Sequence, residues 1–352
     1  MSDPSYSGAN LATTDFLRAP ENIAVLLNAN AKQVNLRLHT ALSSLVPAAN
    51  LFLSRDAAEA DEIADTVVSR GYETVFTGGG DGTFVSWVNH LLDRAERRRA
   101  AVPKFGVLAL GTGNAVAEMV GAGRPVEDLR RYLRGEVPPA RRIDLVTCNG
   151  RRTPFAGAGI DAAVLEDYNW VRRSLGGRAA AGIKGYGLAI ALRSAPRQAF
   201  GRPVYTEVVN TGRRAWRLDA AGERAGRPVE AGELLYAGSC MLVAASTVPY
   251  YGFGMRAFPF AGRRPGVLQL RIATRIPLAS LFFRVPQIFS GEFSHPGLLD
   301  FEAEGVSVSF DREVPFQVGG DSGGRRREMS LGIAPRGVEL LDYAARARRL
   351  AA

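Results

Sequence analysis

A glycine-rich loop is the first place where this chain could carry out chemistry. The loop, Thr77–Thr83, reads TGGGDGT; the strand-like segment 74–76 precedes it, and apolar residues at helical spacing follow from Phe84 to Leu92. Successive glycines let backbone N–H groups approach an anion, and the N-terminus of the following helix adds a positive dipole end. We expect a phosphate here, with Asp81 as a magnesium ligand or as the base that accepts a hydroxyl proton.

A second polar loop repeats this arrangement about thirty residues later. The apolar segment 107–110 leads into Gly111-Thr112-Gly113-Asn114, and helix-like residues follow from Ala115 to Val120. The carboxyl ends of neighbouring parallel strands meet at one edge of a sheet, where open α/β proteins bind ligands. The two loops are therefore expected to face one crevice.

The elements that would position these loops change in type near residue 145. Before it, strand-like and amphipathic helix-like segments alternate, which predicts a doubly wound parallel sheet. After it, short alternating segments predict an antiparallel β-sandwich, so the fold class is α/β plus all-β. We predict a flexible tail at 1–21, an α/β domain at 22–144 and a sandwich domain at 145–330; segment 331–345 is a candidate for returning to the first domain.

Composition restricts the class of protein. The 352 residues are enough for two cores, and no apolar segment reaches the roughly 18 residues of a membrane span. The first twenty residues lack the blocks of a signal peptide, and Cys148 and Cys240 support neither a disulfide framework nor a metal site, which favours a cytoplasmic location. A net charge of +9 indicates an anionic partner, but no nucleic-acid motif accompanies the scattered arginine clusters.

The pair of loops resembles the catalytic domain of the diacylglycerol kinase family, which has sphingosine and ceramide kinases as relatives. NAD kinases share the first motif, GGGDGT, and the superfamily fold. The similarity runs from about residue 22 to about residue 343. Other matching positions are Asn28 after segment 23–27, the segments 142–145 and 158–162, and the aromatic segment 250–255.

This resemblance implies a lipid kinase that uses ATP and Mg²⁺. The acceptor would be the hydroxyl of diacylglycerol, a related glycerolipid or a sphingoid base. In the family the nucleotide lies between a nucleotide-binding and a lipid-binding domain, and Asp81 would stand closest to the transferred group, as catalytic residue and metal ligand. Asn28 would lie near the nucleotide. Thr112 and Asn114 would bond phosphate or metal-bound water, unless they only cap a helix. The other residues that would line the phosphates are Gly78, Gly79, Gly80, Gly82, Thr83, Gly111 and Gly113.

One departure from the family pattern bears on catalysis. Where the family usually has Asp-Gly-Glu after a strand, this chain has Gly319-Gly320-Asp321. Glycine accepts no proton, so either Asp321 or Asp81 is the base, or the chain is a lipid- or nucleotide-binding pseudokinase in which Gly319→Asp restores activity. A second departure, Arg264 in a segment where many members carry an acidic residue, puts the family's structural magnesium site in doubt.

The expected partners follow from the resemblance and the positive charge. They are a lipid alcohol as substrate and an acidic membrane surface on which the cytoplasmic enzyme docks peripherally, with no nucleic acid; a homodimer is left open. A further alternative is the phosphorylation of a soluble dinucleotide, as in NAD kinases, which the long sandwich-like second half disfavours.

Overall fold

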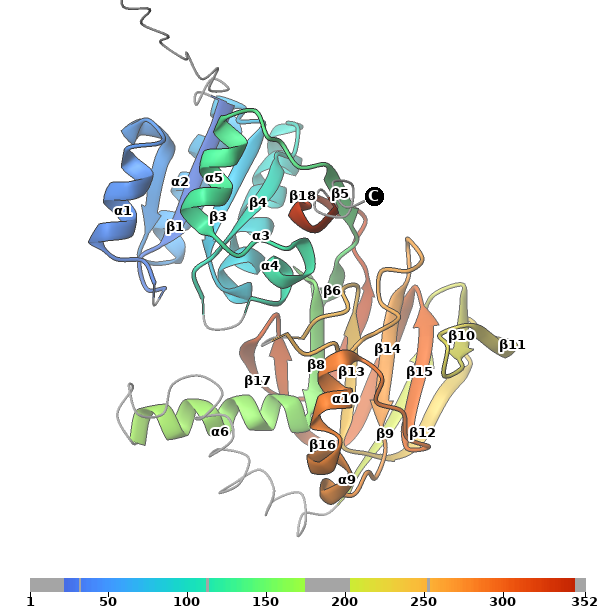
Figure 1. Ribbon diagram of the computed structural model, residues 1–352. Coiled ribbons are helices and arrows are strands. Elements are labelled where there is room, and N and C mark those ends of the chain that lie inside the picture. The colour runs from blue at the N-terminus through green and yellow to red at the C-terminus, as the bar shows by residue number, and fades with distance from the viewer. Residues whose placement is uncertain (1–21, 32, 112–113, 175–202, 252–253, 346–352) are drawn as a thin grey trace, which may run out of the picture.

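The computed structural model describes residues 22–31, 33–111, 114–174, 203–251 and 254–345 (Figure 1). The tail expected at 1–21 lies outside these residues. Two sheets organise the chain, and each has its own hydrophobic core. Within the described residues, no helix combines the length and the apolar character needed to cross a membrane.

The first sheet has six strands in the order β2-β1-β3-β4-β18-β5. Neighbours pair in parallel, except that β5 is antiparallel to β18. The predicted doubly wound parallel sheet is confirmed, with an antiparallel strand at one edge. The strands are β1 Ile23–Asn28, β2 Leu51–Ser54, β3 Thr74–Gly79, β4 Lys104–Ala109, β5 Ala140–Ile143 and β18 Val338–Leu341.

Helices cover both faces of this sheet because its strands are apolar on both sides (Figure 1). In β1, Ala24 and Leu26 belong to the core beneath α2 and α3, whereas Val25 and Leu27 belong to the core beneath α1 and α5. The helices of this domain are α1 Leu36–Ser43, α2 Ala57–Arg70, α3 Asp81–Arg98, α4 Ala115–Val120 and α5 Pro125–Leu133, with a short 3-10 helix at Ala48–Asn50.

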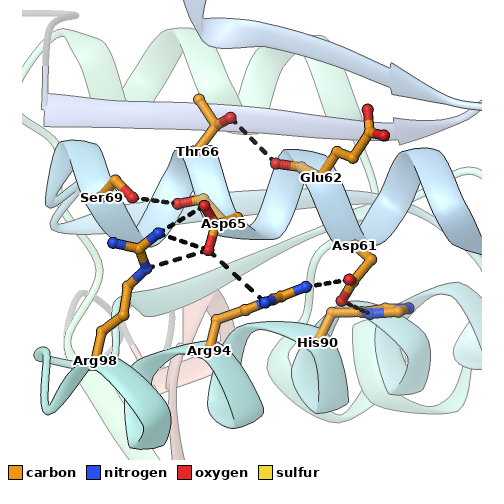
Figure 2. A network of polar contacts seen from close by, with 8 residues as sticks. All are labelled: Asp61, Glu62, Asp65, Thr66, Ser69, His90, Arg94 and Arg98. Atoms are coloured by element: carbon orange, nitrogen blue, oxygen red, sulfur yellow. Dashed lines mark hydrogen bonds and ion pairs between the residues drawn. The ribbon is translucent and has the colours of Figure 1, made fainter.

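Ion pairs tie α2 to α3, the helix that follows the first glycine loop (Figure 2). Arg98 Nη2 lies 2.7 Å from Asp65 Oδ2. Asp61 accepts from Arg94, and His90 Nδ1 lies 3.4 Å from Asp61 Oδ1. These contacts hold α3 against α2.

The second sheet has twelve strands, and all of its pairings are antiparallel. Buried side chains from many of its strands form one core, in agreement with the predicted sandwich. The long β16 (Gly305–Val318) pairs with β8, β9 and β17, so the sheet branches there. The other strands are β6 Val146–Cys148, β7 Arg151–Thr153, β8 Phe155–Gly159, β9 Val204–Asn210, β10 Arg214–Leu218, β11 Arg224–Glu230, β12 Leu234–Cys240, β13 Leu242–Ser246, β14 Leu268–Ala273, β15 Leu298–Ala303 and β17 Asp321–Ile333.

The chain passes between the two sheets twice. It leaves the first sheet after β5 and enters the second at β6, and after β17 it returns to place β18 between β4 and β5. Among the described residues, three helices accompany the second sheet: α6 Ile160–Ser174, α9 Leu278–Phe283 and α10 Val285–Ser290.

Candidate active site

The first glycine loop opens directly into the N-terminus of α3. All six residues of β3 are buried, and Gly80 precedes the 18-residue helix as its N-cap. Gly80 has no side chain to accept from the first turn, so the N–H groups there have no side-chain cap. Such a helix end, with its positive dipole, is suited to binding an anion.

The second loop lies against the first. A Cβ on Gly111 would come 2.2 Å from Gly80 Cα, and the Leu110 N–H donates to Gly79 O at 3.0 Å. Only glycine at 111 permits this approach. The side chain of Asn114 hydrogen-bonds within its own loop, at 3.2 and 3.3 Å to the backbone of Gly111. Thr112 and Gly113 lie outside the described residues.

Asp81 connects the two loops. Its Oδ2 accepts from the Ala115 N–H at 3.0 Å and its Oδ1 accepts from the Val116 N–H at 3.1 Å, so the carboxylate caps the start of α4. Burial raises the pKa of Asp81, the two N–H groups oppose that rise, and the charge of Asp321 adds to it. Asp81 therefore has a structural task besides the chemistry expected of it.

Asn28, at the end of β1, contacts the same helix start. Its Nδ2 donates to Thr83 Oγ1 at 3.0 Å, and its Oδ1 accepts from the Asn30 N–H at 2.9 Å. Gly79 must be small, because a Cβ there would lie 2.3 Å from Thr83 Oγ1. Gly78 must be small for a different reason, because a Cβ added there would lie 2.5 Å from Leu27 Cδ2, inside the core.

Asp321 reaches the start of α3 from the second domain. It is the first residue of β17, after the turn Gly319-Gly320, and it pairs with Val318 across the hairpin. A Cβ on Gly82 would lie 2.6 Å from Asp321 Oδ2, so the carboxylate lies against the first turn of α3. Close packing of protein around the carboxylate raises the pKa of Asp321, although the side chain is exposed on one side, and Arg151 opposes the rise.

Gly319 has a conformation that suits its place in the hairpin. Both turn glycines have positive φ, +59° at Gly319 and +88° at Gly320, as in the two-residue turns that match strand twist. A Cβ on Gly319 would meet Val85 Cγ2 at 2.7 Å and Thr153 Oγ1 at 3.0 Å. This position therefore points at the side of α3, whereas Asp321 contacts its N-terminus.

Two family models match the chain. Residues 22–148 match the diacylglycerol kinase catalytic domain, and residues 205–341 match the YegS C-terminal NAD kinase beta sandwich-like domain. By these models the chain joins a diacylglycerol kinase-like catalytic domain to a YegS-like sandwich domain. The first model identifies a kinase domain of a lipid kinase family, and both glycine loops lie within it.

Solved structures from Bacillus anthracis str. Sterne share this fold. One protein described as a diacylglycerol kinase is 17% identical with a TM-score of 0.62, and a second is 15% identical with a TM-score of 0.61. In both cases the alignment covers 92% of this chain and 98% of the other. No curated protein matches the chain.

Two polar residues near the candidate site, Glu118 and Gln317, were not among the candidates from the sequence. Glu118 of α4 lies close enough to Asp81 for their charges to interact; burial raises the pKa of Glu118, and the Gly254 N–H opposes the rise. A carboxylate one helical turn after the second loop was the available signal. Gln317, the other residue, stands just before the hairpin turn, where its Oε1 accepts from the Gly320 N–H at 2.9 Å.

Gln317 also joins a polar cluster with Asp161 and Tyr251. Its Nε2 lies 3.3 Å from Asp161 Oδ2 and donates to the Tyr251 hydroxyl, which in turn donates to Asp161. Asp161 Oδ1 is buried and accepts no hydrogen bond from the described residues, and burial raises the pKa of Asp161. The cluster supports the turn that carries Asp321.

Proposed function

We propose that this protein transfers the γ-phosphate of ATP to the hydroxyl of a membrane lipid, either diacylglycerol or a related glycerolipid or sphingoid base. The observation that carries this proposal is the contact between Asp321 and Gly82. It brings a carboxylate from the second domain to an uncapped helix N-terminus inside a lipid kinase-family domain. Phosphoryl transfer needs these two parts, an anion-binding site and a proton acceptor, side by side.

The residues at the start of α3 fit the phosphates of ATP. The backbone there is bare because Gly80, Gly82 and Gly111 have no side chains, and the first turn has no side-chain cap. Backbone N–H groups and the helix dipole would neutralise charge on the phosphates. Thr83 and Asn28, which hydrogen-bond each other, would border this site.

Mg²⁺ fits as an ion that the nucleotide brings. The described residues contain no group of three His, Cys, Asp or Glu side chains arranged to hold a metal. In kinases, however, Mg²⁺ is commonly held by one or two carboxylates together with substrate phosphates. The lone pairs that Asp81 keeps beyond its two N–H bonds would supply such a carboxylate. When bound, the ion would neutralise charge on the transferred phosphoryl group.

We assign the role of general base to Asp321 in preference to Asp81. The lipid hydroxyl oxygen would form the new bond to the γ-phosphorus, the bond to the departing ADP oxygen would break, and Asp321 would receive the hydroxyl proton. Its raised pKa makes it a better proton acceptor than an ordinary carboxylate. Asp81 already accepts two N–H groups at the start of α4 and so acts mainly by holding the loops together.

The pseudokinase alternative loses its main support in this arrangement. It depends on glycine at 319, but that position points at Val85, and the neighbouring turn delivers Asp321 instead. An acid is therefore available at the helix start without any change at 319.

The test is transfer of labelled γ-phosphate from ATP to lipid alcohols in mixed micelles with Mg²⁺, with NAD as a soluble competitor acceptor. Labelled lipid from the wild type, greatly reduced in Asp321→Asn, supports the proposal and identifies the acceptor. Labelled NADP in place of labelled lipid would show that the protein acts as an NAD kinase. ATP binding without any labelled product would make the chain a pseudokinase.

A further inference from the structure

The helical cap formed by residues 275–291 has an exposed apolar surface. It contains α9 and α10 and belongs to the segment that connects β14 to β15 along the chain (Figure 1). Phe283 is 79% exposed, Val285 42% and Phe289 38%. These are three of the eight large hydrophobic side chains that are exposed in the described part of the chain, and they lie within seven residues of one another.

The opposite side of the cap is anchored in the protein. Leu281 and Ile288 pack against a small core that includes Met241, Ile276 and Phe293. The cap therefore has one buried and one exposed apolar side. Exposed apolar side chains gathered in one short segment are typical of a binding surface.

The charge of this region is of a single sign. No Asp or Glu occurs between Glu233 and Glu292, and the six charged residues in this interval are all arginines. Three of them, Arg264, Arg271 and Arg263, have hydrogen bonds to carboxylates or to backbone carbonyls elsewhere in the sheet domain. The other three, Arg256, Arg275 and Arg284, are exposed and form no ion pair with the residues that the structure describes. Arg284 donates to Ser294 O at 3.5 Å, and the Arg256 guanidinium lies 5.9 Å from the centre of the Tyr250 ring.

The cap is continuous with the candidate active site. The Arg256 N–H donates to Phe289 O at 3.2 Å, and a Cβ on Gly291 would lie 3.1 Å from Arg256 Cβ. Arg256 follows the loop in which Tyr251 contacts Asp161 and Gln317. The exposed apolar surface and the turn that carries Asp321 are thus connected through one loop.

We propose that the cap 275–291 is the surface with which this enzyme docks on a bilayer that contains anionic phospholipid. Phe283, Val285 and Phe289 would enter the boundary between headgroups and acyl chains, and Arg256, Arg275 and Arg284 would contact the phosphates. Aromatic and aliphatic residues next to exposed arginines that form no ion pair, within a sequence interval that has no carboxylate, match the chemistry of such a surface. The inference rests on the proposed function, because docking here would bring the membrane to the loop that leads to Asp321.

Vesicle co-sedimentation in the absence of ATP tests the docking surface. Vesicles of phosphatidylcholine alone are compared with vesicles that also contain phosphatidylglycerol. The double variant Phe283→Ala/Phe289→Ala should bind the mixed vesicles at least about tenfold more weakly, since each ring loses apolar burial. Arg284→Gln should bind them about fivefold more weakly, from roughly 1 kcal/mol per arginine at an anionic surface.

A matched control is available in the same domain. Tyr205 and Leu234 are 47% and 51% exposed, on the paired strands β9 and β12. Tyr205→Ala/Leu234→Ala removes a similar apolar area outside the cap and should bind as the wild type does. The proposal is overturned if the cap variant binds like the wild type, or if the control variant loses as much binding. It is also overturned if size-exclusion chromatography shows a dimer that only the cap variant loses, since the occupant is then a second copy.

Docking and catalysis can fail separately. Phosphate transfer to a short-chain, water-soluble diacylglycerol should be the same in the wild type and the cap variant, while transfer to diacylglycerol in mixed vesicles falls with vesicle binding. If the wild type binds vesicles through the cap but phosphorylates neither acceptor, the docking surface stands and the proposed function does not. If transfer to vesicle diacylglycerol is unchanged in the cap variant, the docking surface is refuted and the kinase stands.

Discussion

Replacing Gly319 by aspartate tests the assignment of Asp321 most directly. If 319 is the missing catalytic position, Gly319→Asp should raise phosphate transfer. In the structure the new side chain would start 2.7 Å from Val85 Cγ2, and Val85 is only 1% exposed, so it has little room to move. We therefore expect loss of stability and no gain in activity.

The size of the loss follows from two costs. A non-glycine residue at φ +59° costs about 1 kcal/mol, toward the lower end for aspartate, and overpacking a filled core costs about 1–3 kcal/mol. Gly320 separates the two costs. Its φ is +88°, but a Cβ there meets nothing within 4 Å, so Gly320→Asp has the backbone cost alone.

Thermal unfolding followed by calorimetry measures this difference. Gly319→Asp should unfold at a temperature roughly 3–9 °C below that of Gly320→Asp, from about 3 °C for each kcal/mol in a domain of this size. Transfer assays on both variants complete the test. Equal unfolding temperatures would refute the packing argument, and a transfer rate above that of the wild type in Gly319→Asp would refute the assignment of Asp321.

Three further predictions concern carboxylates. Asp321→Asn should lower transfer by about 10²–10⁴-fold, while ATP binding, measured by calorimetry, stays close to normal. Because the pKa of Asp321 is raised, the wild-type rate should rise with pH through a value above the ordinary 3.8; the same pH profile in the variant would contradict this. Asp81→Asn should lower transfer by about 10²-fold or more, since an amide cannot accept from both N–H groups that start α4; an unchanged rate would remove Asp81 from the mechanism. Arg94 lowers the pKa of Asp61, so this pair stabilises the fold above pH 3.8 and stabilises it less as pH falls through the lowered pKa. Asp61→Asn should therefore unfold at a lower temperature than the wild type at neutral pH, and this difference in unfolding temperature should shrink in acid.

The local structure of the first glycine loop could be predicted from sequence. A strand, a glycine loop and an amphipathic helix are contiguous, and Gly80 stands at the N-cap as such a junction requires. The roles of single glycines could not be separated in this way. Gly78 and Gly111 look alike in the motifs, but one avoids a core leucine and the other allows two loops to touch.

The contribution of the second domain was harder to predict. Asp321 meets Gly82 only because β16 and β17 are joined by a two-residue turn, and the register of that hairpin sets which residue faces α3. Alignment to a family pattern placed Gly319 at the expected aspartate and left Asp321 as one of two candidate bases, since it counts positions and not the direction of side chains. The parallel order of the first sheet followed from the alternation of segments, whereas the insertion of β18 between β4 and β5 is a long-range pairing with no local signal.

The position of Asp321 depends on how α3 is held against the second sheet. Asn89 of α3 donates from Nδ2 to Arg152 O and accepts from the Arg152 N–H, at 2.7 and 2.9 Å. The Arg152 guanidinium extends the attachment to Asp93 at 2.6 Å and to Glu96 at 2.9 Å. The backbone N–H and C=O of Arg152 are thus both bonded to the side-chain amide of Asn89, which fixes the distance between α3 and β7. Helix α3 begins at the first glycine loop, and β7 leads into β8, which pairs with the hairpin strand β16. This attachment therefore couples the proposed phosphate site to the carboxylate that is proposed to serve it.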